Sequence, residues 1–217
     1  MKFGVIGLGR FGYHVATVLA ENGMEVLAID SNDSIVSSIR DQVTQAICLR
    51  VADEASLRSV GVDEMDVVIV AMGENFAQSI LATALIKKHL HVPKVITRAI
   101  NDIHCEILTL VGADRVILPE KEIGINLAES LSSPFVYIAR LSKEFSIGQI
   151  ETPKSLIGKK ITDLTIFDSY SITCIGLKRA DIFTPSTDDN FNNFILEKGD
   201  EIILAGEHNS LSRLAKL

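Results

Sequence analysis

The stretch that decides the fold is Lys2-Phe3-Gly4-Val5-Ile6-Gly7-Leu8-Gly9-Arg10-Phe11-Gly12. Its first half is an apolar run that predicts a β-strand, and its glycines predict a tight turn that leads at once into a helix. Gly7 lets the chain turn sharply, Gly9 lets the backbone approach a phosphate closely, and Gly12 lets the helix pack against the sheet. The stretch therefore predicts a helix N-terminus that faces a phosphate-bearing ligand.

The second predicted strand, residues 26–29, is followed by Asp30 and Ser31. Asp30 stands 18 residues after Gly12, at a spacing where a carboxylate accepts hydrogen bonds from the hydroxyls of a ribose. The same charge repels a 2′-phosphate, so the spacing favours adenosine or NAD over NADP. The alternative is a plain tight turn followed by an aspartate that caps a helix.

Strand-like and helix-like segments alternate from the N-terminus to about residue 118. The predicted strands are 3–6, 26–29, 46–49, 67–71, 94–97 and 115–118. The predicted helices are 11–22, 33–41 with Asp33 or Ser34 as its cap, 53–60, 75–89 and 101–111. Strands rich in Val and Ile that alternate with helices are typical of a parallel sheet covered on both faces. We therefore expect a doubly wound, Rossmann-like α/β domain.

A further predicted helix, residues 120–131, ends at Ser132-Ser133-Pro134, and the pattern changes after it. Short strands separated by turns are predicted over 136–141, 145–151, 172–178 and 201–205, with a small helix over 209–217. This pattern predicts a smaller α+β domain. We expect residues 1–134 to form the first domain together with a linking helix, and residues 135–217 to form the second.

The composition is that of a soluble globular protein, with 47% hydrophobic and 23% charged residues. The formal net charge of −7 argues against a broad nucleic-acid surface. The longest apolar runs are too short to cross a bilayer, and the N-terminal run lacks the pattern of a signal peptide. We therefore expect a cytoplasmic protein that binds no nucleic acid.

The three cysteines, Cys48, Cys105 and Cys174, are far apart and form no Cys-x-x-Cys pair. Their number and spacing predict neither a disulfide framework nor a zinc site. Because Cys48 and Cys174 lie within apolar runs, both are predicted to be small core residues.

The carboxyl ends of the later strands complete the ligand pocket in this type of fold. The third strand is followed by Arg50-Val51-Ala52-Asp53, which is expected to face the adenine. The fourth ends in Ala71-Met72-Gly73, where Gly73 permits a close approach of the chain to the ligand. Asn75 is expected either to cap the long helix or to contact the ligand.

Two arginines are placed to meet the charge of a phosphate. Arg10 lies inside the glycine loop, where a guanidinium can pair with a terminal phosphate. Arg98 ends the fifth strand, at the same edge of the predicted sheet. A surface ion pair is the alternative role for Arg98.

Four motifs together resemble one family: KFGVIGLGRFG at 2–12, Asp30, VIVAMG at 68–73 and GADRVILPE at 112–120. They are similar to the RCK domains, the regulators of K⁺ conductance, which include the KtrA- and TrkA-type regulatory subunits of bacterial potassium transporters. The resemblance extends over almost the whole chain, since the second predicted domain is similar to the family's C-terminal regulatory domain.

The resemblance implies a nucleotide sensor and not an enzyme. Such subunits form homodimers that assemble into a homo-octamer, a ring on the cytoplasmic face of a membrane potassium-translocating subunit. They bind ATP or ADP, or alternatively NAD or NADH, and the ligand changes the shape of the ring and so gates the pore.

The resemblance also implies roles for single residues. It implies that Arg10 reaches a γ-phosphate and that Arg98 contacts the nucleotide. It implies that Glu120 lies at the dimer interface and takes part in binding Mg²⁺ or another divalent cation. For Glu120 the alternative is a favourable charge at a helix N-terminus.

Some relatives bind cyclic di-AMP in the C-terminal domain, where an arginine often follows an Asp-Leu-x-Ile stretch. Here Asp163-Leu164-Thr165-Ile166 is followed by Phe167. The missing cation argues against this second ligand, although Ile166 and Pro185 would suit a base-stacking pocket. Arg50 is another departure, since many relatives carry Asp or Asn at this position.

The main alternative is a small NAD-dependent oxidoreductase or a redox sensor. A Tyr-x-x-x-Lys pair is absent, because Thr, Leu and Cys stand four positions after Tyr13, Tyr137 and Tyr170. The five histidines show no metal-ligand spacing, and all of them, His104 included, are expected to be structural or exposed. A redox-sensing repressor would need a basic DNA-binding element, which this acidic sequence does not show.

Overall fold

The computed structural model describes residues 1–73, 75–132, 135–142, 144–164 and 166–214. Contacts divide the chain into two units, Met1–Lys121 and Glu122–Leu217. Helix α6, Pro119–Ser132, begins in the first unit and continues into the second. The domain boundary expected at residues 134/135 stays a prediction.

The first unit is built on a six-stranded parallel sheet with the order β3-β2-β1-β4-β5-β6. The strands are β1 Lys2–Ile6, β2 Glu25–Asp30, β3 Gln45–Cys48, β4 Val67–Val70, β5 Lys94–Arg98 and β6 Arg115–Ile117. The order reverses at β1, which pairs with both β2 and β4. In a doubly wound sheet this reversal opens a crevice at the carboxyl ends of the strands. The predicted Rossmann-like α/β fold is confirmed.

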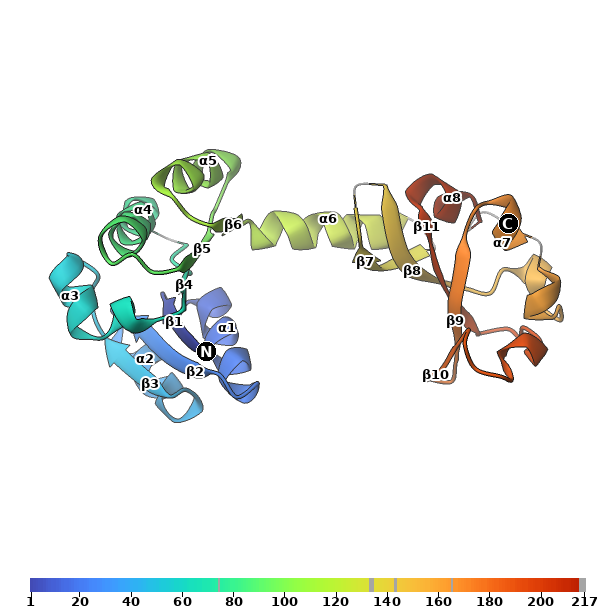
Figure 1. The fold of residues 1–217 in the computed structure, drawn as a ribbon, viewed down its shortest axis with the longest axis horizontal. Helices are drawn as coiled ribbons and strands as arrows, with labels where there is room; N and C mark the ends of the chain where they lie inside the picture. The colour runs from blue at the N-terminus through green and yellow to red at the C-terminus, as the bar shows by residue number, and fades with distance from the viewer. Residues whose placement is uncertain (74, 133–134, 143, 165, 215–217) are drawn as a thin grey trace. The chain divides into compact units, whose positions relative to one another are not determined.

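Helices connect these strands (Figure 1). They are α1 Arg10–Glu21, α2 Asp33–Ile39, α3 Glu54–Ser59, α4 Phe76–Ala84, which a π-helical turn at Leu85–His89 extends, and α5 Asp102–Val111. Each of the helices α2 to α5 is capped by a side chain that accepts an N–H group of the first turn. The capping residues are Asn32, Asp53, Asn75 and Asn101. Asn75 is thus a cap as predicted, whereas α2 is capped by Asn32 and not by Asp33 or Ser34. Among the helices of the described ranges, none combines the length and the apolar character needed to span a membrane.

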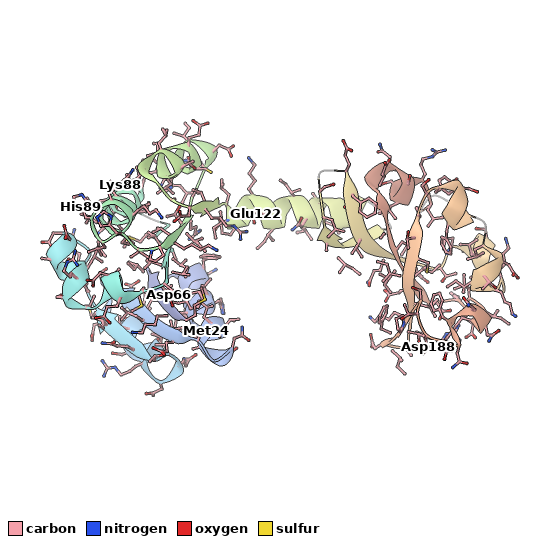
Figure 2. All side chains as sticks on the ribbon, viewed as in Figure 1. Met24, Asp66, Lys88, His89, Glu122 and Asp188 are labelled. Carbon is pink, nitrogen blue, oxygen red and sulfur yellow. The ribbon has the colours of Figure 1, made fainter. Side chains whose placement is uncertain are left out.

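Successive residues of a strand point to opposite faces of the sheet. Side chains on both faces of the parallel sheet are buried in packed clusters. The residues that pack together on one face include Ile6, Ile29 and Val70 of the strands, Leu57 of α3 and Ile86 of the π-helical turn. Those on the other face include Val5, Ala28 and Ile69 of the strands, Ala16 of α1 and Val36 of α2. Figure 2 labels Met24 and Asp66, which directly precede β2 and β4. They mark the amino ends of the strands, opposite the glycine loop.

The second unit contains a five-stranded antiparallel sheet with the order β10-β9-β11-β8-β7 (Figure 1). Its elements are β7 Phe135–Arg140, β8 Phe145–Glu151, α7 Ile166–Ser169, β9 Thr173–Arg179, β10 Ile182–Pro185, β11 Glu201–Glu207 and α8 His208–Leu214. Its core contains Ile150, Leu177, Ile202, Leu204 and Leu211. The predicted α+β character is confirmed, while residues 215–217 of the predicted last helix lie outside the described residues.

Strand β10 was not predicted, and the turn before it explains why. Ala180 and Asp181 have positive φ angles of 47° and 66°, and Arg179 pairs with Ile182 across them. Two consecutive left-handed residues form the kind of two-residue hairpin turn that usually carries Asn-Gly or Asp-Gly. Because Ala-Asp is not such a signal, the sequence pattern does not reveal this hairpin.

Candidate nucleotide site

The glycines at the junction of β1 and α1 lie in different steric surroundings. Gly7 has a φ of +93°, and a Cβ there would lie 3.0 Å from the backbone nitrogen of Met72. A Cβ on Gly12 would overlap the carbonyl oxygen of Gly7. Above Gly9, by contrast, no described atom lies within 4 Å of a Cβ position. The loop is therefore packed on its inner side and open over Gly9.

The N-terminus of α1 faces this open space without a side-chain cap. Gly9 is the N-cap residue, and the first turn contains no acidic side chain. The free N–H groups and the helix dipole make such an end attractive to an anion. Arg10 is exposed at the first helical position, and its side chain bonds to none of the described residues. Positive charge thus gathers at the mouth of the loop.

Asp30, at the end of β2, joins the second strand to the glycine loop. Its Oδ2 accepts the N–H of Leu8 at 2.6 Å, and its Oδ1 accepts the N–H of Asn32 at 2.8 Å. Each carboxylate oxygen retains a further lone pair, so the carboxylate can still accept a ribose hydroxyl. The ribose contact of Asp30 and Ser31 stays a prediction.

Arg98, at the end of β5, lies against the loop that follows β4. A Cβ on Gly73 would overlap the Nη1 atom of Arg98, so the guanidinium lies directly against this loop. Nη2 donates to the carboxylate of Glu120, and Cζ lies 5.9 Å from the ring centroid of Phe11. The glycine loop, the β4–α4 loop, β5 and α6 therefore meet at one guanidinium.

A comparison with known families matches residues 3–119 to the TrkA-N domain. The chain belongs to the TrkA-N family. It is 36% identical over 216 residues to the Ktr system potassium uptake protein A of Bacillus subtilis, a match that covers 98% of this chain and 94% of that protein.

Solved structures share the fold of this TrkA-N protein. The GsuK RCK domain is 22% identical with a TM-score of 0.51, and the match covers 96% of this chain and 44% of that one. The GsuK channel described as bound to NAD is 21% identical with a TM-score of 0.53, over 99% of this chain and 38% of that one. GsuK described as bound to ADP is 25% identical with a TM-score of 0.51, and the match covers 60% of this chain and 33% of that one. This chain spans less than half the length of those GsuK chains, and the likeness shows the shared fold.

The loop after β3 of the TrkA-N domain is bonded to the first turn of α4. Gln78, in the first turn of α4, donates from Nε2 to the carbonyl of Val51 at 2.8 Å. Val51 is only 3% exposed, so little of this residue is open to a ligand in this structure. Ala52 is exposed, while Asp53 caps α3 through a capping box with Ser56. Contacts of this loop with adenine, and of Ala71 and Met72 with the ligand, stay predictions.

Cys48 departs from the sequence-based prediction. It was expected in the core, but it is exposed and its Sγ lies 3.6 Å from the carbonyl oxygen of Ser31. It is the last residue of β3, an edge strand that has a neighbouring strand on one side only, unlike the central strands. It pairs in register with Asp30, so a thiol lies beside the expected ribose position. Cys174 is partly buried, and burial raises the pKa of its thiol to about 11.

Glu120 does not form a metal site with the residues around it. Its carboxylate is paired with Arg98 and is 68% exposed. In the described part of the chain, no three His, Cys, Asp or Glu residues gather closely enough to hold a metal ion. A divalent cation is bound in proteins by several oxygen ligands, and one carboxylate already paired with a guanidinium does not fit that requirement. The surroundings of Glu120 in this chain therefore do not support the expected metal site.

His104 is the polar residue near this site whose partners the sequence did not reveal. It is fully buried on α5, with Nε2 at 2.8 Å from Oγ of Ser79 and Nδ1 at 3.4 Å from the amide nitrogen of Ile100. Its ring centroid lies 4.3 Å from that of Phe76. Burial lowers the pKa of His104, so the ring is neutral near pH 7. The only sequence signal is helical spacing, which places His104 on the same face as buried Leu108.

The stretch expected to decide cyclic di-AMP binding falls partly outside the described residues, since Thr165 and the side chain of Ile166 lie there. Phe167 packs, partly buried, against the core of the second unit. Pro185 is exposed at the end of β10. We do not include cyclic di-AMP in the proposed function.

Proposed function

We propose that this protein is a nucleotide-sensing regulatory subunit of a membrane potassium uptake system. One observation carries the proposal: the uncapped N-terminus of α1 opens over Gly9, between the cation of Arg10 and the carboxylate of Asp30. An enzyme would need a reacting group beside this space, and we assign none. The 36% identity with the Ktr system potassium uptake protein A supports the choice of transport system.

The ligand of this site is an adenine nucleotide. The helix N-terminus suits a phosphate, and the Asp30 carboxylate suits an unphosphorylated ribose. GsuK is described as bound to NAD in one structure and to ADP in another, which supports the adenosine part common to both. We favour ATP or ADP because Arg10 can pair with a terminal phosphate, with NAD or NADH as the alternative. Any Mg²⁺ would be held chiefly by the phosphate oxygens.

Regulation requires that the ligand binds two shapes of the assembly with different affinity. We propose that the chain forms homodimers, which assemble into a homo-octamer on the cytoplasmic side of the membrane and contact the potassium-translocating subunit there. A nucleotide with one more phosphate gains a contact only in the shape where Arg10 reaches it. That difference in contacts would shift the equilibrium between the two shapes of the ring.

Nucleotide binding by the purified full-length chain tests the proposal. We expect ATP, ADP or NADH at 100 times its dissociation constant to stabilise the protein by about 2.7 kcal/mol in thermal unfolding. Light scattering should give the mass of an oligomer, and co-expression with a potassium-translocating subunit should make uptake nucleotide-dependent. If no adenine nucleotide binds, or if the protein transfers hydride to a substrate, the proposal is wrong.

A further inference from the structure

A buried polar pair connects the two loops between which Arg98 lies. Ser79 belongs to the first turns of α4, which begins after the Gly73 loop, and its hydroxyl donates to the carbonyl of Phe76 at 3.1 Å. His104 contacts that hydroxyl through Nε2 and receives the N–H of Ile100 at Nδ1. Because Nδ1 accepts, Nε2 carries the proton and donates to Ser79. One imidazole thus bonds to the chain after β4 and to the chain after β5.

Arg98 itself is held by few directed bonds. Its side chain is 19% exposed, and its ion pair is made with Glu120, which is 68% exposed. Its Nε atom is buried with no hydrogen-bond partner among the described residues. The guanidinium also lies against Gly73, where a Cβ would overlap it. A shift of the β4–α4 loop would therefore change the space that the guanidinium occupies.

Packing alone does not need a polar pair at this place. A hydrophobic residue at position 104 would also fill the space beside Phe76, and Leu108, one turn later on the same helix, is a buried residue of that kind. The imidazole and the hydroxyl instead add bonds whose direction depends on how the two loops are placed. Buried polar groups of this kind specify a geometry, since each costs free energy when its partner moves away.

We propose that His104 and Ser79 are positioning residues of the nucleotide site. Their hydrogen bond sets the distance between the β4–α4 and β5–α5 loops, and so holds Arg98 where a bound nucleotide meets it. The inference rests on the proposed function, because it assigns a role within the same site.

Nucleotide titration of variants tests the inference by calorimetry. We expect Ser79→Ala and His104→Phe to weaken binding about tenfold, because each leaves a buried group unpaired and the loops free to shift. His104→Gln keeps an N–H donor for Ser79 and should restore most of the affinity. Leu108→Val is the matched control, since it destabilises the same face of α5 without touching either loop, and it should leave the affinity unchanged.

A double-mutant cycle separates positioning from general loosening of the domain. If Ser79 acts through Arg98, then Ser79→Ala should cost less than about twofold when Arg98→Ala is already present. An equal loss in both backgrounds, or an equal loss in Leu108→Val, would overturn the inference. Unchanged affinity in Ser79→Ala would do the same. These outcomes presuppose that the wild-type chain binds a nucleotide, whereas absence of wild-type binding refutes the proposed function itself.

Discussion

Alanine substitutions at Gly9 and Gly12 should affect different properties, since one should act mainly on nucleotide binding and the other mainly on stability. The two glycines are three residues apart, Gly9 at the N-cap of α1 and Gly12 in its first turn, but they face different surroundings. Gly12 packs on the backbone of Gly7, whereas no described atom lies within 4 Å of a Cβ on Gly9. We therefore expect Gly12→Ala to destabilise the first unit and Gly9→Ala to remove nucleotide binding from a folded protein.

The magnitudes follow from these contacts. A Cβ on Gly12 would overlap the Gly7 carbonyl oxygen and lie 2.9 Å from the Cβ of Ala71, whereas carbon atoms pack best at about 3.5–4.0 Å. Because backbone must move, we expect the upper end of the overpacking cost, about 3 kcal/mol. That corresponds to a melting temperature lower by about 10 °C for a unit of this size. Gly9 has a φ of −61°, which alanine adopts, so Gly9→Ala should cost only about 1 kcal/mol through the weaker helix cap.

Thermal unfolding with and without nucleotide measures both effects at once. The wild type should gain about 2.7 kcal/mol at 100 times the dissociation constant. Gly9→Ala should unfold close to the wild-type temperature without ligand and gain nothing with it. If Gly9→Ala gains as much as the wild type, the space over Gly9 does not hold a phosphate. If Gly12→Ala unfolds at the wild-type temperature, the packing argument for Gly12 is wrong.

Three further predictions concern charge and chemistry. Arg10→Ala should weaken ATP binding more than ADP binding in calorimetry, and equal losses would contradict a role at the terminal phosphate. In a Cys105→Ser protein, saturating nucleotide should slow alkylation of exposed Cys48, which lies beside the expected ribose position; an unchanged rate would place the ligand elsewhere. In the second unit, burial alone would raise the pKa of Asp200, but the Arg179 guanidinium and the N–H of Glu197 together outweigh it and lower the pKa. The stability that this pair contributes should be present above the usual pKa of a carboxyl group and should be lost as the pH falls below it. Urea unfolding of Asp200→Asn should lack that acid-dependent loss of stability.

The parallel sheet was predictable because its signals are local. Most of its strands are short runs rich in Val and Ile, and each of its helices begins at a polar cap or ends near a glycine. The two errors have different origins. The hairpin at Ala180 and Asp181 lacks the usual turn residues, and Cys48 lies in an apolar run whose position at the sheet edge depends on strand order.

Several parts of the site were not predictable in the same way. The close fit of Arg98 against Gly73 joins residues 25 positions apart, and the same separation divides Ser79 from His104. Neither pair has a spacing that local periodicity can reveal. Both exist because β5 lies beside β4, so that the loops after these strands are neighbours.

The sequence alone determined the glycine loop, the alternation of strands and helices, the acidic residue after β2 and the family resemblance. These depend on residue type and short-range spacing, which act through backbone sterics and burial. Only the tertiary structure decided that Glu120 pairs with Arg98, that Asp30 ties β2 to the glycine loop, and that His104 bonds to two loops at once. Those contacts depend on strand order and on the packing of distant segments, which the local pattern does not encode.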